Sequence, residues 1–228
     1  QDAAGLEHGL RRLAALAFAH EGRLVVPSGT MRDWPSIAWR GVHLFVGPTA
    51  LRFHQDLWGR ALLDLGFNKA LIQCERTAWA SLPATETAIT MPRADLVHLF
   101  DWYRGHGVEP IPLVQSFGHM EWFFANDQNR DALFNPEVPY SLDPRKPAAR
   151  AKLTALWDEV ATLLKPQSMH FGLDEVDMRG WPDDPELVTE LWGLHLPFLG
   201  HIAAKHGATM MLWGDKALAP GEAVDATH

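Results

Sequence analysis

The sequence has little of what several protein classes require. Its 228 residues include a single cysteine, Cys74, so no internal disulfide can form; this is typical of a reducing compartment, although exported enzymes also lack disulfides. Basic residues are outnumbered, 20 Lys and Arg against 28 Asp and Glu, for a formal net charge of -8. Nucleic acids and anionic membranes need a basic surface, so neither is an expected partner. No apolar run is long enough to span a bilayer.

Phosphate-binding motifs are missing as well. The first expected strand runs into Val46-Gly47-Pro48-Thr49, which is not the Gly-rich turn of a dinucleotide-binding sheet, and no GxxxxGK[ST] segment occurs. We therefore expect no cofactor. Tryptophan, in contrast, is abundant, with ten residues. Most should lie in the core, and one or two are expected to form a flat apolar platform that suits the face of a sugar ring.

Strands and helices alternate along the chain from Arg40 onward. This alternation predicts right-handed βαβ units around a parallel sheet. We expect residues 1–35, with a helix at 6–19 and a short strand at 24–26, to be the end of an N-terminal α/β domain or a linker. The expected strands are 41–46, 70–75, 109–115, 168–174 and 209–213, and the expected helices are 50–65, 94–106, 146–164 and a part of 185–206.

The polar residues decide between the two α/β architectures, an open doubly wound sheet and a (β/α)8 TIM barrel. They recur where the expected strands end, at Glu75, Gln115 and His119, Asp174 and Glu175, and Asp215. In a (β/α)8 barrel these ends form the active-site face, so the pattern favours the barrel. Five strands are visible where a closed barrel needs eight. We expect residues 36–228 to be an incomplete catalytic barrel of about five βα units.

The segment from His170 to Glu175 is the strongest local signal for chemistry. Period-2 alternation turns Phe171 and Leu173 toward the helices, and turns His170, Gly172 and Asp174 toward the barrel interior. Gly172 should leave space near a substrate, with Asp174 pointing into the pocket and Glu175 at its rim. Neighbouring carboxylates in a partly dry site push their pKa values apart, so one can act as an acid. A solvated Asp-Glu pair at a helix start is the alternative.

Two histidines, His43 and His170, are expected to face the barrel interior. A metal-dependent barrel hydrolase would want clustered ligands, such as a His-x-His pair on the first strand. Here that strand offers a single histidine. We therefore expect no catalytic metal.

Several motifs, in order, resemble one family. HFGLDEV at 170–176 resembles the H-x-G-x-D-E signature of glycoside hydrolase family 20, the β-N-acetylhexosaminidases, and Arg40-Gly41, preceded by Asp33 and Pro35, resembles that family's D-x-P-x(n)-R-G opening. IPLVQSFGHME at 111–121 is similar to the hexosaminidase D branch, as are 141–144 and 212–215. The likeness runs from about residue 9 to 217.

This resemblance implies a retaining exo-β-N-acetylhexosaminidase that acts on terminal amino sugars by substrate-assisted catalysis. Glu175 would be the general acid and base, and Asp174 would hold the acetamido N–H. Arg40 would donate hydrogen bonds to ring hydroxyls, and His119 would lie near Glu175 and set its proton affinity. Trp213 would form part of the apolar surface around the acetamido methyl group. The branch also points to a cytoplasmic enzyme. The choice between glucosamine- and galactosamine-type sugars and the oligomeric state are left open.

The second strand departs from the family pattern. The hexosaminidase D branch has an E-Y-E-D-like segment where this chain has Gln73-Cys74-Glu75-Arg76, so Glu75 is the acidic residue that is kept. Gly214 replaces another acidic residue, which leaves Asp215 as a further candidate contact. Two alternatives therefore stay open: a carbohydrate-binding barrel without turnover, and a two-carboxylate glycosidase with Glu175 as acid and Glu75 or Asp215 as nucleophile.

Overall fold

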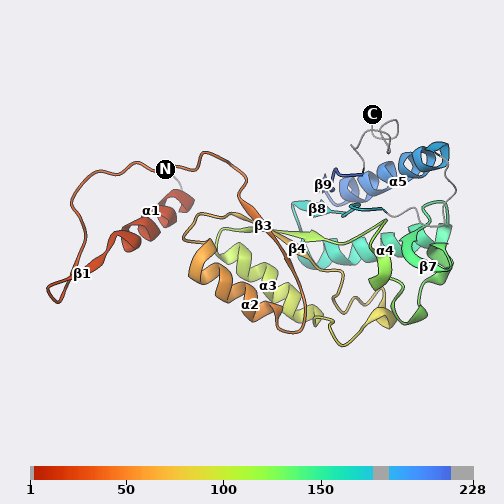
Figure 1. Ribbon diagram of the computed structural model, residues 1–228, viewed down its shortest axis with the longest axis horizontal. Coiled ribbons are helices and arrows are strands. Elements are labelled where there is room, and N and C mark those ends of the chain that lie inside the picture. The colour runs from red at the N-terminus through yellow and green to blue at the C-terminus, as the bar shows by residue number, and fades with distance from the viewer. Residues whose placement is uncertain (1–2, 177–184, 217–228) are drawn as a thin grey trace.

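A five-stranded parallel sheet organises the chain. The structure, a computed structural model, describes residues 3–176 and 185–216. Every neighbouring pair of strands in this sheet is parallel, and the five strands lie side by side in the order in which they occur along the chain. The strands, in spatial order, are β3 (Gly41–Phe45), β4 (Lys69–Gln73), β5 (Glu109–Leu113), β8 (Ser168–His170) and β9 (Thr209–Met211) (Figure 1).

Sequential order of this kind belongs to a (β/α)8 barrel, because a doubly wound sheet reverses its order at a switch point. The barrel prediction is confirmed for the strands that the structure describes. Residues 177–184 and 217–228 of the expected barrel segment lie outside the described residues. All five strands end earlier than predicted: β3 by one residue, β4, β5 and β9 by two, and β8, which ends at His170, by four. Beyond His170 the backbone turns, since Gly172 and Leu173 both have a positive φ of 75° and 74°.

Helices follow the strands and contact one another in chain order. The predicted helix over 50–65 is divided, because a wider π-helical turn (Trp58–Leu62) follows its first eight residues. The helix before β8 begins with Pro147 at its first position and is capped at its end by Lys165, which has a left-handed backbone conformation. Both residues are of the kind expected at helix ends. The helices are α2 (Ala50–Leu57), α3 (Arg93–Gly105), α4 (Pro147–Leu164) and α5 (Pro185–Lys205).

Alternate strand residues divide the interior into two layers. On β4, Ala70 and Ile72 pack in the large core between the sheet and the helices. Leu71 between them faces the other way, into a small apolar cluster with Ile111 and Leu113. The second layer is the barrel interior. Successive residues of one strand therefore alternate between the core that faces the helices and the apolar cluster inside the barrel.

A long excursion separates β5 from α4. It contains short 3-10 turns at Met120–Trp122, Ala125–Asp127 and Arg130–Ala132, and a hairpin of β6 (Leu133–Asn135) with β7 (Val138–Leu142). The amide of Leu142 donates to the carbonyl of Phe117, which ties the hairpin to the segment after β5. A fourth 3-10 turn, Pro83–Thr85, lies between β4 and α3. The excursion thereby places the β6–β7 hairpin, which is distant in sequence from β5, near the carboxyl end of the sheet.

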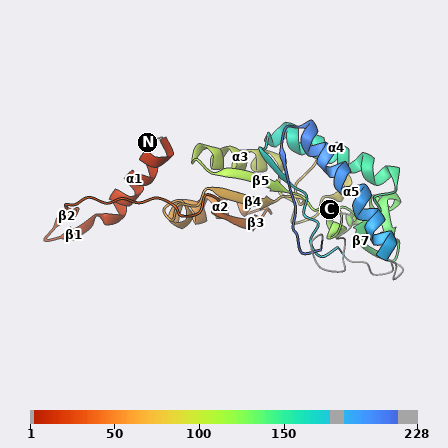
Figure 2. The ribbon, with the colours of Figure 1, turned by 90° about the horizontal axis from the view of Figure 1, so that it is seen from above.

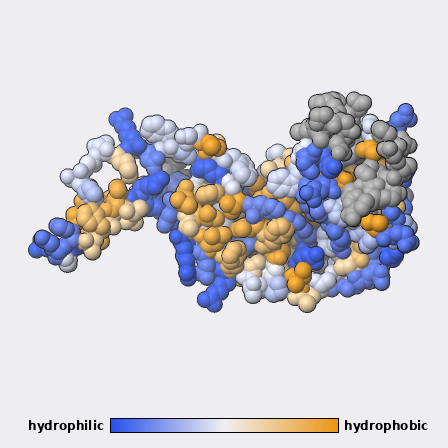
Figure 3. All heavy atoms as spheres, viewed as in Figure 1, coloured by the Kyte–Doolittle hydropathy of each residue, from blue (hydrophilic) through white to orange (hydrophobic). Residues whose placement is uncertain are grey.

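Residues 3–39, here called the amino-terminal arm, extend away from the sheet (Figures 1 and 2). Its helix α1 (Ala3–Leu16) begins and ends three residues earlier than predicted. The strand β1 (Phe18–His20) follows it and pairs antiparallel with β2 (Arg23–Val25). The connecting turn uses left-handed Glu21 and Gly22. Apolar side chains gather on the arm surface (Figure 3), and Leu6 and Leu24 are 67% and 78% exposed.

None of the helices described in 3–176 and 185–216 combines the length and the apolar character that crossing a membrane takes.

Candidate active site

A cavity of about 310 Å³ opens at the carboxyl ends of the strands. The sequence predicted that polar side chains would meet there, and three of the expected residues, Glu75, His119 and Asp174, line this cavity together. Its other walls come from β3 and from the excursion after β5. The remaining lining residues are His43, Phe45, Val46, Gln73, Arg76, Gln115, Glu121 and Trp122.

Gln115 orients Asp174. Its amide nitrogen donates to Asp174 Oδ1 over 2.6 Å, while its amide oxygen accepts from the backbone N–H of Leu173 over 3.3 Å. Because one end of the amide must accept, the other end must donate, and Asp174 is held as a hydrogen-bond acceptor. Asp174 Oδ2 is left to the cavity side, where the His119 ring lies.

Gly172 makes room for Gln115 and not for a substrate, which corrects the sequence-based expectation. A Cβ atom at Gly172 would overlap the Gln115 side-chain amide. The positive φ of 75° adds strain for any residue with a side chain. Glycine is therefore required here to let the residue that orients Asp174 pass over the backbone.

Glu175 lies beside Asp174 with its side chain turned outward, 75% exposed. Its backbone is held on both sides: the N–H donates to Asp215 Oδ2 over 3.0 Å, and the carbonyl accepts from the Tyr140 hydroxyl over 3.1 Å. Asp215, which was expected to contact substrate, is thus bonded to the Glu175 backbone in this structure, because that N–H points at it. The left-handed Glu175, with φ 44°, depends on these bonds to stay in place.

His119 bridges the two carboxylates. Its Nε2 atom lies 3.4 Å from Glu175 Oε2 and 3.7 Å from Asp174 Oδ2. Its Nδ1 atom lies 3.0 Å from the Tyr140 hydroxyl oxygen. Since that hydroxyl donates its one proton to the Glu175 carbonyl, Nδ1 carries the hydrogen and Nε2 faces the carboxylates.

Tyr140 was missed by the sequence reasoning. It stands one residue before the Ser141-Leu142-Asp143-Pro144 segment that resembles the hexosaminidase D branch, and that adjacency was the available signal. Only the β6–β7 hairpin shows that its hydroxyl reaches across to His119 and Glu175.

Glu75 is enclosed at the base of the cavity. Gln73 donates to its Oε1 atom over 2.6 Å, and His43 Nε2 lies 2.8 Å from the Gln73 amide oxygen. Burial raises the pKa of Glu75 to about 7, the nearby Asp174 adds to this increase, and the Gln73 bond opposes it. The carboxyl group is therefore close to half protonated at neutral pH. Gln73 and His43, not proposed as site residues from sequence, set its orientation.

Trp213 lies in the barrel interior next to the cavity. Its ring centroid is 4.6 Å from that of His170 and 5.7 Å from that of His43, and it packs against the cluster that contains Leu71. Burial, with the neighbouring His43, lowers the pKa of His170 to about 4, so this imidazole is neutral. A role for Trp213 as a wall of the site remains a prediction, since the residue adjoins the cavity through His43.

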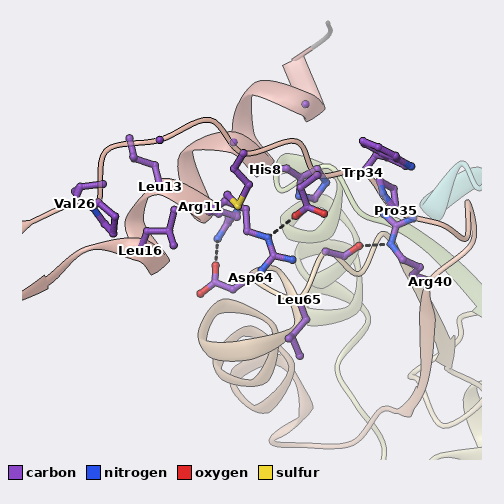
Figure 4. A pocket seen from close by; sticks show the side chains of 18 residues that line it. His8, Arg11, Leu13, Leu16, Val26, Trp34, Pro35, Arg40, Asp64 and Leu65 are labelled. Atoms are coloured by element: carbon purple, nitrogen blue, oxygen red, sulfur yellow. Dashed lines mark hydrogen bonds and ion pairs between the residues drawn. The ribbon is translucent and has the colours of Figure 1, made fainter.

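The structure places Arg40 at the opposite end of the sheet, which corrects the expectation that it grips a sugar. Arg40 precedes β3, and its guanidinium donates to the carbonyls of Gly66 over 2.6 Å and Ala38 over 3.2 Å, and also to that of Ile37. It borders a second cavity of about 680 Å³ between the arm and the loop at Asp64 (Figure 4). The amino end of a strand cannot reach a site at the carboxyl ends.

Within residues 3–176 and 185–216, no three His, Cys, Asp or Glu side chains are grouped so that they could hold a metal ion.

Comparison with known proteins places this arrangement in context. No family model matches the chain. Hexosaminidase D of Bos taurus is 30% identical over 119 residues, which are 47% of this chain and 34% of that protein. The solved chitobiase of Flavobacterium johnsoniae superposes with a TM-score of 0.78 at 19% identity, over 96% of this chain and 38% of that one.

The fold is that of the family 20 glycoside hydrolases. The β-N-acetylhexosaminidase of Streptomyces coelicolor A3(2), with a TM-score of 0.75 and 21% identity over 95% of this chain, agrees with it. The resemblance inferred from the motifs is thereby confirmed in sequence and in fold. The chain spans about a third of hexosaminidase D and 49% of the Streptomyces coelicolor structure.

Proposed function

We propose that this chain forms the catalytic part of a retaining exo-β-N-acetylhexosaminidase, which removes terminal N-acetylated amino sugars by substrate-assisted catalysis. The observation that carries the proposal is the contact of His119 with both carboxylates, 3.4 Å from Glu175 and 3.7 Å from Asp174. A general acid and an acetamido-binding carboxylate are the two groups that this chemistry needs from the protein. Similarity to family 20 hexosaminidases supports the same assignment.

In the first step the carbonyl oxygen of the substrate's 2-acetamido group attacks the anomeric carbon. The bond from that carbon to the leaving oxygen breaks, its electron pair goes to the oxygen, and Glu175 supplies the proton. Asp174 accepts a hydrogen bond from the acetamido N–H and stabilises the positive charge that spreads over the oxazolinium ring. Because Gln115 already holds one oxygen of Asp174, this charge is met by an oriented carboxylate.

In the second step a water oxygen bonds to the anomeric carbon and the bond to the acetamido oxygen breaks. The water's proton goes to the Glu175 carboxylate, which returns the acid to its starting state. Two inversions at one carbon leave the β configuration unchanged. His119 presents Nε2 to Glu175 Oε2 over 3.4 Å, where it can accept a hydrogen bond from the acid.

The exposure of Glu175 fits an acid that acts on a leaving group at the mouth of the cavity. Asp174, whose side chain is 29% exposed, lies deeper. A terminal sugar with its acetamido group beside Asp174 would therefore direct its glycosidic oxygen outward, toward Glu175. This arrangement suits removal of a single sugar from a chain end.

Hydrolysis of chromogenic β-N-acetylglucosaminide and β-N-acetylgalactosaminide by the full-length protein tests the proposal. Glu175→Gln should lower kcat by about 100- to 10,000-fold, the range for loss of a general acid. Glu137→Gln, the same exchange in the exposed turn between β6 and β7, is the matched control and should keep full activity.

The comparison with a chromogenic β-glucoside separates the alternatives. A substrate without the acetamido group cannot supply the internal nucleophile. It should be hydrolysed at least about 1,000-fold more slowly, because it loses the rate advantage of an intramolecular attack. Equal rates on both would favour a two-carboxylate glycosidase. Binding of N-acetylglucosamine without turnover of any substrate would favour a binding barrel.

A further inference from the structure

Two residues that line the cavity each carry an enclosed polar atom without a hydrogen-bond partner among the described residues. Glu75 Oε2 and Trp122 Nε1 are both enclosed, and neither makes a hydrogen bond within the part of the chain that the structure describes. The two residues are 7% and 4% exposed and border the same space as Asp174. An enclosed donor or acceptor without a partner is unfavourable, and native proteins keep few of them without a functional reason.

The other Glu75 oxygen is held by a chain of hydrogen bonds from two strands. His43 on β3 donates to the Gln73 amide oxygen over 2.8 Å, and the Gln73 amide nitrogen donates to Glu75 Oε1 over 2.6 Å. A glutamate at position 73 would instead place a second carboxyl group beside that of Glu75, and the two would repel each other when ionised. Gln73, which departs from the family pattern, therefore gives Glu75 a hydrogen-bond donor that an ionised glutamate could not supply.

The chemistry of the unpaired atoms selects a hydroxyl group as their ligand. A hydroxyl can accept from the Trp122 N–H and donate to a Glu75 carboxylate, and it can also accept from Glu75 when that carboxyl is protonated. An anionic ligand group would be repelled by Glu75 and Asp174. An ammonium group could not accept from Trp122.

We propose that Glu75, held by Gln73 and His43, recognises a ring hydroxyl of the terminal sugar and determines specificity for it, with Trp122 as the adjoining donor. This rests on the proposed function, which puts the acetamido group at Asp174. Recognition requires Glu75 Oε2 to become accessible from the cavity, because this atom is enclosed in the structure. Glu75 takes the part that the motifs assigned to Arg40, which lies at the other end of the sheet.

The test uses 4-nitrophenyl N-acetyl-β-glucosaminide and its 3-, 4- and 6-deoxy analogues with the full-length protein. The wild type should hydrolyse one deoxy analogue with kcat/KM lower by about 10- to 100-fold, as for a hydroxyl that meets an enclosed charged group. Glu75→Ala should lower kcat/KM for the parent substrate to the same level and abolish the discrimination. Glu75→Gln should restore part of it, whereas a packing role would leave discrimination intact in every variant.

Trp122→Phe is the second variant, because it removes the indole N–H and keeps a smaller aromatic ring at the same position. It should weaken discrimination at the same hydroxyl even if Glu75→Ala fails to fold, and Glu137→Gln should leave it unchanged. Undiminished discrimination in folded Glu75 and Trp122 variants overturns the inference while hydrolysis by the wild type upholds the proposed function. If no substrate is hydrolysed, calorimetric binding of N-acetylglucosamine and its deoxy analogues measures the same discrimination, and absence of binding rejects both proposals.

Discussion

The Tyr140 hydroxyl oxygen lies 3.0 Å from His119 Nδ1, although 20 residues and a β-hairpin separate the two side chains in the chain. The same hydroxyl donates to the carbonyl of Glu175 over 3.1 Å. One oxygen atom therefore connects the imidazole that faces both carboxylates to the backbone of the proposed acid. The position of the acid therefore depends on a residue of the β6–β7 hairpin, which is distant from Glu175 in the sequence.

Tyr140→Phe should lower kcat with little change in KM. The substitution keeps the ring and removes the hydroxyl, so His119 loses the partner that holds its Nδ1–H and Glu175 loses a backbone bond. We expect kcat to fall about tenfold, and stability to fall by about 1–3 kcal/mol, as for two hydrogen bonds. Steady-state kinetics and urea unfolding measure the two effects. A kcat within a factor of two of wild type would show that the hydroxyl does not position the acid.

Three glycine-to-alanine exchanges distinguish the cost of backbone strain from the cost of steric overlap between the new Cβ atom and its neighbours. Gly193 is exposed in α5 with open space at its Cβ position, so alanine there should stabilise by about 0.5–1 kcal/mol. Gly207 has φ +65° and open space, so alanine should destabilise by about 1–2 kcal/mol from strain alone. Gly172→Ala adds the overlap with Gln115 and should destabilise by about 2–4 kcal/mol and lower activity. Chemical denaturation measures the order, and equal effects at 172 and 207 would contradict the role given to Gln115.

Glu75 should make the folded protein less stable as pH rises. Its folded pKa of about 7 is raised above the ordinary 4.5, mainly by burial, so the native state holds more protons than the unfolded state between these values. Stability from this group is full below pH 4.5 and is lost as pH rises through 7. Relative to Glu75→Gln, the wild type should lose about 3 kcal/mol between pH 4.5 and 8. Denaturation curves of both proteins at each pH give the difference, in which other titrating groups cancel. A constant difference would mean that folding does not raise the pKa of Glu75.

Arg40→Ala should reduce stability and leave KM unchanged. Its guanidinium satisfies backbone carbonyls at 37, 38 and 66, and loss of charge-assisted bonds of this kind costs about 1.5–3 kcal/mol each at most. A residue at the amino end of β3 does not contact a sugar at the carboxyl ends. Thermal unfolding and KM for the parent chromogenic substrate distinguish the two roles. A KM raised tenfold in a well-folded variant would restore Arg40 to the sugar site.

Much of the fold follows from local pattern. Leu71 alternates with Ala70 and Ile72, and this alternation is a property of consecutive residues that needs no knowledge of the rest of the chain. The same reasoning overextended β8, because His170 to Asp174 keeps a strand-like alternation while Gly172 and Leu173 turn to positive φ. Propensity does not report a turn that is stabilised by the side chain of Gln115, 58 residues away from Leu173.

The sequence by itself determined the order of strands and helices, the carboxylate pair Asp174 and Glu175, and the end of the sheet at which polar residues gather. Each of these follows from the spacing of residues that are close together in the sequence. Only the tertiary structure decided that Tyr140 and Gln115 orient that pair, that Gln73 and His43 hold Glu75, and that Arg40 braces the far end. Those relationships join residues on different strands and loops. They arise when hydrogen-bonding groups from separate parts of the chain are buried together and must find partners among one another.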